Sequence, residues 1–334
     1  MNNLSVLGKF LDQPILVSKF QKAVPAILAG GAAAYTAYDA SKEAPEKRKQ
    51  RALKTGLTLG VTVASALAAP HIASAITKRK LPASLDVIKR NNKEIIDTFI
   101  KSAKPEEATS KILEKGKDKI LNFKEVKSIY TNLKDKSSGK EFLEKLIPSP
   151  ENMSAKDIFS EIGYLSIFGA VPVVGGILGG IAADRATDKE NWKAKVPDKI
   201  KEGSYQYLAN IFMCNVGAGA ALGIMEKCGI KSKASRAIGM TAGIVATGII
   251  GGSKIANLIS EKIIDPCFNK KKNKANVDKA EQANRERKPE ALDIGLHTDD
   301  IATVSLLSGL KWIEPALPVM YTLSGYRAGI GYRN

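Results

Sequence analysis

Residues 162–183 read IGYLSIFGAVPVVGGILGGIAA, which is 22 consecutive residues without a charged side chain. As an α-helix this stretch would be about 33 Å long, close to the roughly 30 Å hydrocarbon core of a bilayer. A helix in the core of a soluble protein normally keeps a polar stripe for water, and this stretch has none. It therefore predicts a helix whose surroundings are lipid.

Other parts of the 334-residue chain repeat this pattern. Four further runs lack charged residues, and a fifth is interrupted only by Lys311 and Glu314; the five are 23–38, 55–77, 203–225, 237–253 and 301–326. The longest runs span a bilayer unaided, and flanking lysines can snorkel to extend the 16- and 17-residue runs. We expect an all-α, polytopic membrane helical bundle of five or six helices. The alternative is a large soluble all-α protein, because the runs are rich in Ala, Gly, Ser and Thr.

The predicted organisation has six parts. A basic amphipathic leader (1–22) precedes a first membrane helix pair (23–77), a polar helical module (78–160), a second membrane unit of three helices (161–260), a basic loop (261–300) and a C-terminal broken membrane segment (301–334). In the polar module, Val126, Ile129 and Leu133 recur at helical spacing, and Ser84 is placed to cap a helix. This module is expected to face water.

A partial internal duplication relates the two membrane units. At an offset of 183, six residues of the segment from Gly56 meet identical residues in the segment from Gly239: Gly56, Thr58, Gly60, Ile72, Ala73 and Ile76. Internal repeats are a construction principle of transporters, but they also occur in proteins without transport activity. The run at 203–225 has no counterpart in the first unit.

Glycine pairs at spacing four predict how the helices pack. Lipid provides no hydrophobic drive for association, so helices in a membrane associate through small residues that allow close backbone approach. Six Gly-x-x-x-Gly pairs are candidates for these helix-packing positions: Gly56 and Gly60, Gly175 and Gly179, Gly176 and Gly180, Gly219 and Gly223, Gly239 and Gly243, and Gly325 and Gly329. The same faces allow copies of the chain to form a homo-oligomer.

The charge balance points to anionic lipid as a partner. Lysine and arginine number 51 against 34 acidic residues, a formal net charge of +17. Basic side chains beside membrane helices contact anionic headgroups most simply, and the candidates are Lys47, Arg48, Lys49, Lys78, Arg79, Lys80, Lys270, Lys271 and Lys272. A nucleic-acid partner is disfavoured, because the charge is spread over many loops and aromatic residues are scarce.

Few residues suggest chemistry. The chain has two histidines, and three cysteines without a CxxC pair, so it shows no recognisable catalytic triad, metal motif or disulfide framework. We therefore expect no enzymatic activity, no metal and no cofactor. Polar groups in or beside the apolar runs are the better candidates, because burying them in lipid is costly. His71, Lys311 and Glu314 form the candidate intramembrane polar site.

These features lead to three hypotheses for function. The first is a non-enzymatic, tightly packed membrane scaffold or assembly component at a multi-pass membrane location. The second is a small transporter or pore with a site at the repeat interface. The third is a soluble basic helical protein that binds nucleic acid or anionic lipid surfaces.

Overall fold

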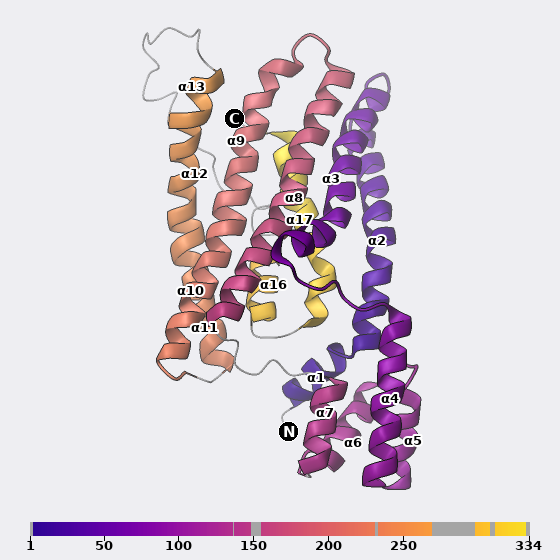
Figure 1. The fold of residues 1–334 in the computed structure, drawn as a ribbon. Coiled ribbons are helices and arrows are strands. Elements are labelled where there is room, and N and C mark those ends of the chain that lie inside the picture. Colours follow the sequence, from indigo (N-terminus) through magenta and orange to yellow (C-terminus); the bar gives the residue numbers. More distant parts are fainter. Residues whose placement is uncertain are drawn as a thin grey trace. The chain divides into compact units, whose positions relative to one another are not determined.

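The computed structural model describes residues 3–135, 137–147, 155–230, 233–268, 298–307 and 311–331. Within these ranges the chain is helical and contains no β-strand (Figure 1). It divides into two compact units. The first unit comprises Met1–Val24, Leu81–Met153 and Ser308–Pro315, and the second comprises Pro25–Lys80, Ser154–Leu307 and Ala316–Asn334.

The first unit is built from short helices. They are α1 (Asn3–Leu11), the beginning of α2 (Pro14–Ser41), α4 (Leu85–Ala103), α5 (Glu107–Gly116), α6 (Phe123–Leu133), α7 (Ser137–Leu146) and most of the 3-10 helix η5 (Lys311–Ala316). The structure thus groups the N-terminal leader with the polar module, which the sequence analysis kept apart. It also places residues 311–315 in this unit, whereas residues 301–307 and 317–330 belong to the second unit.

Local sequence explains where these helices begin. The Ser84 side chain accepts the backbone N–H of Val87 at the start of α4. At the start of α6, Asn122 and Glu125 form a reciprocal capping box, in which each side chain accepts the other residue's backbone N–H at 3.0 and 2.7 Å. Asp12 caps η5, because its carboxylate accepts the N–H groups of Lys311 and Trp312, both at 2.9 Å.

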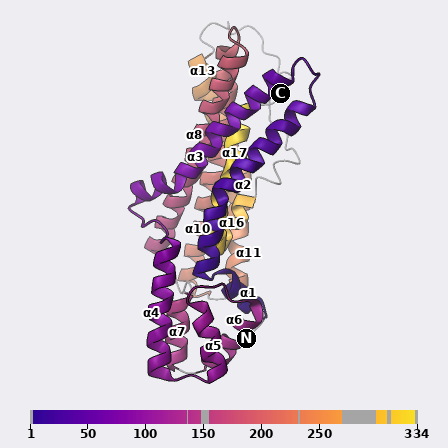
Figure 2. The ribbon, with the colours of Figure 1, turned by 90° about the vertical axis from the view of Figure 1, so that its right-hand side faces the viewer.

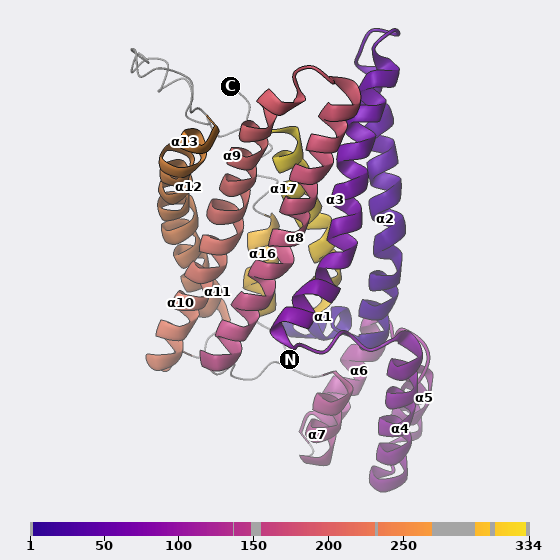
Figure 3. The same cartoon turned by 45° about the horizontal axis from the view of Figure 1, so that its top comes forward.

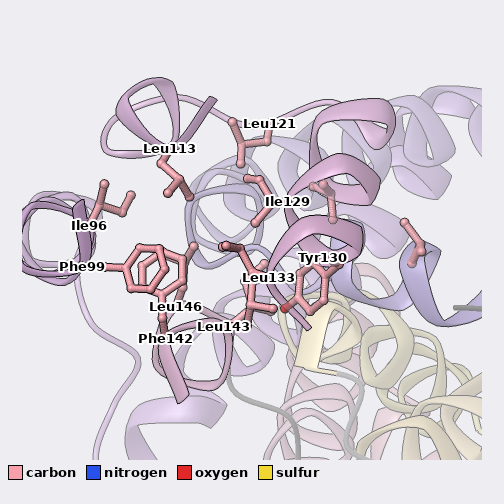
Figure 4. Packing of buried hydrophobic residues seen from close by; sticks show 13 residues of the cluster. Ile96, Phe99, Leu113, Leu121, Ile129, Tyr130, Leu133, Phe142, Leu143 and Leu146 are labelled. Atoms are coloured by element: carbon pink, nitrogen blue, oxygen red, sulfur yellow. The ribbon is translucent and has the colours of Figure 1, made fainter. Parts of the chain in front are cut away.

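A closed apolar core holds the first unit together. Its members come from α1, α4–α7 and the connections next to these helices, and they are more than 90% buried; they include Val6, Ile96, Phe99, Leu113, Leu121, Val126, Ile129, Leu133 and Phe142. The rings of Phe99 and Phe142 stack with centroids 4.0 Å apart (Figure 4). Gln13 joins this core through two hydrogen bonds to the Leu121 backbone, one donated at 2.9 Å and one accepted at 2.8 Å. Figure 2 shows α4–α7 grouped together.

The second unit is built from much longer helical segments. They are most of α2, α3 (Arg48–Thr77), α8 (Ala155–Thr187), η1 (Trp192–Lys195), α9 (Val196–Tyr207), the π-helix η2 (Leu208–Phe212), α10 (Met213–Lys227), α11 (Lys233–Ile244), the π-helix η3 (Val245–Gly252), α12 (Ser253–Ile259), the π-helix η4 (Ser260–Ile264), α13 (Asp265–Phe268), α16 (Thr298–Leu307) and α17 (Leu317–Ile330). Among the residues that the structure describes, three helical segments are long and apolar enough to cross a membrane: Arg48–Thr77, Lys156–Thr187 and Trp192–Lys227.

The long helices lie side by side, with α8 between α3 and α9 (Figures 1 and 3). α3 and α8 are antiparallel, because Arg79 at the end of α3 meets Glu161 near the start of α8, and Lys54 near the start of α3 meets Asp184 near the end of α8. Two further contacts show that α8 is also antiparallel to α9–α10. Asp184 near the end of α8 meets Lys199 of α9, and Ser166 in the first half of α8 meets Asn215 of α10.

The two segments that the predicted duplication would relate differ in structure. The first, from Gly56, lies in the continuous α-helix α3, whereas the second, from Gly239, runs through α11, the π-helix η3 and α12. Their glycines also meet different neighbours. A Cβ added at Gly56 would touch Thr36 of α2 at 3.6 Å, and one added at Gly239 would overlap Met225 of α10.

Candidate functional site

The closest backbone contacts of the second unit join α8 to α17. A Cβ added at Gly176 would overlap the carbonyl oxygen of Gly325, and one added at Gly180 would overlap that of Gly329. Because the residue numbers of both helices increase in the same direction along this contact, α8 and α17 are parallel here. Each therefore contributes one Gly-x-x-x-Gly pair to a contact that leaves no room for side chains, the arrangement that small residues permit between helices.

A second glycine face of α8 meets α3. A Cβ at Gly175 would overlap the Ser65 hydroxyl, and one at Gly179 would lie 2.9 Å from both the Thr58 carbonyl oxygen and the Val61 Cβ. α8 thus uses adjacent glycines for two different neighbours, α3 on one side and α17 on the other.

The remaining predicted glycines fall into two groups. Gly243 faces the carbonyl oxygen of Gly217 across α10 and α11, and Gly219 faces the Ile162 side chain, so both are tightly enclosed. By contrast, a Cβ at Gly60 or Gly223 would meet no described atom within 4 Å. The spacing of glycines alone does not distinguish these two groups.

Two ion pairs bracket the glycine contact between α3 and α8. Arg79 pairs with Glu161 at 2.7 Å and also lies over the Tyr164 ring, with its guanidinium carbon 4.2 Å from the centroid. At the other end Lys54 pairs with Asp184 at 2.8 Å. The two acidic residues are 23 positions apart on α8, or about 35 Å along the helix.

Asp184 is the centre of a buried charge cluster. Its carboxylate is fully buried and pairs both with Lys54 and with Lys199 of α9, each at 2.8 Å. Lys199 is 2% exposed and also donates to the carbonyl oxygen of Gly329 at 2.7 Å. One carboxylate therefore ties together α3, α8 and α9, and through Lys199 also α17.

A second buried pair lies next to the first along α9. Glu202 and Arg327 of α17 are almost completely buried, with the Arg327 Nε 3.7 Å from Glu202 Oε1. Gln206 donates to the same Glu202 oxygen at 2.8 Å, and Asn210 donates to Gln206 at 3.0 Å. These side chains follow one another at a spacing of four residues, so they form a polar row along one face of α9 and into η2.

A separate polar contact lies nearer the other end of α8. Asn215 accepts a hydrogen bond from Thr303 of α16 at 2.8 Å and contacts the Ser166 hydroxyl at 3.5 Å. All three residues are buried. The π-helix η2 contains Asn210 and is followed directly by α10, which carries Asn215; π-helical turns often occur at functional positions.

The sequence analysis did not select these charged residues. Asp184 and Arg327 directly follow charge-free runs, and Glu202 directly precedes one, so each was taken as a boundary. A signal was nevertheless present: Lys199, Glu202, Gln206 and Asn210 share one helical face that leads into an apolar run. That stripe marks an interior polar row and not a water-facing surface.

The predicted polar site lies elsewhere. His71 is exposed on α3, in the second unit. Lys311 and Glu314 belong to η5 in the first unit, where Lys311 is exposed and its backbone N–H is held by Asp12. His71 thus belongs to a different unit from Lys311 and Glu314.

The predicted headgroup residues occupy both ends of α3. Lys47, Arg48 and Lys49 are exposed at its N-terminus, and Lys78 and Lys80 are exposed after its C-terminus. Arg79 is the exception, since it is engaged with Glu161 and Tyr164. Lys270, Lys271 and Lys272 lie outside the described residues.

No group of three or more His, Cys, Asp or Glu side chains that could hold a metal ion occurs in the part of the chain that the structure describes. Comparison with known proteins gave no relative. No family model matches the sequence, and no match was found among curated proteins or solved structures.

Proposed function

We propose that the protein is a non-enzymatic, multi-pass integral membrane protein that serves as a tightly packed scaffold or assembly component. The helices of the second unit would cross the bilayer, and the first unit would be a water-facing module. The observation that carries this proposal is the position of two ion pairs between α3 and α8, Arg79–Glu161 and Lys54–Asp184. The helix between them lacks charged residues over about 35 Å, which is the distance needed to span a hydrocarbon core and reach both interfaces.

The outer surface of the second unit supports a lipid environment. Large apolar side chains are exposed along its helices, among them Ile27, Val174, Leu178, Ile224, Ile238 and Ile301. Single exposed apolar residues are common on soluble proteins, but here they lie on helical runs that also lack charges. Lipid would solvate such a surface without the cost that water imposes.

The interior supports a scaffold. Buried charges in lipid are tolerated when they pair with one another. Asp184 and Glu202 are matched by Lys199 and Arg327, and the glycine contacts bring backbones together with no space between them. This interior is suited to holding helices in a fixed register. We also propose that the second unit contains a partial duplication, in which α3 and α11–α12 are divergent copies.

Sidedness of labelling tests the proposal. Lys49→Cys and Lys80→Cys are matched single substitutions at exposed positions at opposite ends of α3, made after replacing the exposed Cys228 and Cys267 by serine. A membrane-impermeant maleimide should label one position in intact cells and the other only in inverted vesicles. Labelling of both positions from the same side would contradict the spanning model. Release of the protein by alkaline carbonate without detergent would support the soluble alternative instead.

A transporter or pore is the second candidate, favoured by the row of buried Glu202, Gln206 and Asn210. In transporters, polar groups at membrane depth mark ion and proton pathways. Proteoliposomes loaded with a pH-sensitive dye test this function. A proton flux that depends on the protein and is lost in Glu202→Gln would favour transport over the scaffold, and no flux above protein-free liposomes would leave the scaffold as the better account.

The proposed partners are the bilayer, with anionic headgroups at the ends of α3, and further copies of the chain. Gly60 is exposed with open space above it, so copies could associate through this face of α3. A Gly60→Leu variant should then dissociate on a sizing column with light scattering, whereas Gly223→Leu, on α10, serves as the control. Equal masses for both variants and the wild type would remove Gly60 from the proposed interface.

A further inference from the structure

A basic depression lies at the end of the second unit where α3 begins and α8 ends. Its volume is about 340 Å³, within the range of small-molecule sites, and its walls are formed by Glu43, Lys47, Gln50, Arg51, Lys54, Thr187, Asp188 and Lys195. These residues come from the turn before α3, the N-terminus of α3, the end of α8 and η1. The depression is therefore formed between segments that are distant in sequence.

Contacts behind the depression fix three of its cations in place. Arg51 is held by Asp39 at 2.6 Å, Lys54 by Asp184 at 2.8 Å, and Lys195 by Asp188 at 2.7 Å. Gln50 donates to the carbonyl oxygen of Thr187 at 2.7 Å and so joins α3 to the end of α8. An anion entering the depression would meet cations that are already oriented, which reduces the entropic cost of binding.

The segments around the depression carry a net positive charge, although the carboxylates of Asp39, Asp184 and Asp188 are paired with three of the cations in its walls. The two segments that form it, residues 41–54 and 184–195, hold ten Lys and Arg against five Asp and Glu. The 30-residue helix α3 also begins at this point, and its N-cap residue Lys47 makes no side-chain cap, so the positive end of the helix dipole adds to the field.

The position of the depression along the helices indicates which kind of anion it would bind. Charge-free helix begins at Thr55 on α3 and ends at Ala183 on α8, directly next to Lys54 and Asp184. In a membrane this is the depth of the headgroups. We propose that the depression binds the phosphate of an anionic phospholipid headgroup, a proposal that rests on the membrane location proposed above. Basic pockets between membrane helices are known to hold such headgroups.

The test uses the full-length protein in nanodiscs of phosphatidylcholine, with and without phosphatidylglycerol. Native mass spectrometry counts the phosphatidylglycerol molecules that stay bound. The pocket variant combines Lys47→Gln with Lys195→Gln, and the matched control combines Lys156→Gln with Lys227→Gln, which removes the same charge from exposed positions at the start of α8 and the end of α10. We expect the pocket variant to bind the lipid about 10- to 30-fold more weakly than the wild type, and the control to retain it.

Three results would overturn the proposal. Equal weakening in both double variants would mean that surface charge attracts the lipid without a site. Unchanged binding in the pocket variant would remove the depression from lipid binding. Inorganic phosphate that raises the unfolding temperature in pure phosphatidylcholine discs as much as phosphatidylglycerol does would make the site one for free phosphate. Failure of the membrane location itself is recognised separately, by release in the carbonate wash.

Discussion

The two units distribute their residues in opposite ways. The first unit buries apolar side chains such as Ile96, Leu113 and Phe142 and presents polar residues outward. Among the described residues, all large exposed apolar side chains except Leu7 and Leu81 lie in the second unit, which buries the charges of Asp184, Lys199, Glu202 and Arg327. The two units thus differ in what they expose, as expected if the first unit faces water and the second, as proposed above, faces lipid.

The means of packing differ in the same way. Large side chains fill the core of the first unit, where the hydrophobic effect stabilises their burial. The second unit instead brings backbones together at Gly176 and Gly325 and joins helices through buried ion pairs. In lipid the hydrophobic effect does not favour association of helices, so close contact and polar pairing must provide the stabilisation.

The largest expected effect comes from breaking the charge cluster of the second unit. Asp184→Asn removes the carboxylate shared by Lys54 and Lys199 and leaves the fully buried Lys199 without its counter-ion. We expect a loss of about 3–5 kcal/mol in unfolding free energy, since an unpaired buried charge is costly. Thermal unfolding in mild detergent measures the effect.

The matched control for that substitution is Asp188→Asn. Asp188 is also near the end of α8 and pairs with a lysine, Lys195, but both partners are partly exposed. No measurable loss is expected, because exposed ion pairs contribute little. Equal losses in the two variants would show that burial of the Asp184 cluster is not what stabilises the second unit.

The second-largest loss of stability is expected from a change in the glycine contact between α8 and α17. Gly176→Ala places a methyl group against the Gly325 carbonyl oxygen, where no flexible side chain can move away. We expect destabilisation of about 1–3 kcal/mol. Gly60→Ala is the control, and it should be neutral or stabilising by up to about 1 kcal/mol, because alanine favours helix and the space there is open. If both variants unfold at the wild-type temperature, the close approach of α8 and α17 is not required.

The first unit should respond to the loss of a buried hydrogen-bonding group. Gln13→Ala leaves the backbone N–H and carbonyl of Leu121 without their partner, at an expected cost of about 1–3 kcal/mol. Hydrogen exchange should then show faster exchange in α4–α7, with α8 unchanged. The exposed Asn91→Ala is the control. Faster exchange throughout α8 would contradict the division into two units.

The smallest effect concerns pH. Burial raises the pKa of Asp12 above its ordinary value of 3.8, although the N–H groups of Lys311 and Trp312 act in the opposite direction. The folded protein then holds this proton more tightly than the unfolded chain, so stability is greatest below pH 3.8 and decreases as pH rises through the raised pKa. We expect a difference below about 1 kcal/mol, because Asp12 is partly exposed to solvent.

Asp12→Asn tests this dependence, because it keeps an oxygen that accepts the N–H groups but cannot titrate. Its unfolding temperature between pH 3.5 and about 6 should show a shallower decrease than that of the wild type. An identical pH profile for both proteins would show that Asp12 does not contribute.

Periodicity in the sequence predicted the elements more readily than their partners. Val126, Ile129 and Leu133 recur at helical spacing, and all three are buried in the first unit. The charge-free runs at 55–77 and 162–183 lie in helices long and apolar enough to cross a membrane. Each of these features depends on local sequence, which a pattern can reveal.

Contacts between distant segments could not be predicted from the sequence in the same way. Gly60 and Gly176 have the same spacing signature, yet one meets open space and the other meets a backbone. Asp184 was taken as the end of a run because its partner Lys199 is supplied by the next helix. The choice of partners depends on how helices are oriented and registered, and no single stretch of sequence contains that information.

Spin-label accessibility tests the difference in solvent most directly. A label at Leu178→Cys would lie on the exposed apolar face of α8, and a label at Lys124→Cys on the exposed face of α6. In reconstituted liposomes we predict that the label at 178 is relaxed by oxygen and not by a water-soluble nickel chelate, whereas the label at 124 is relaxed by the chelate. If the chelate relaxes both labels equally, the second unit is surrounded by water and the account of its fold and function is contradicted.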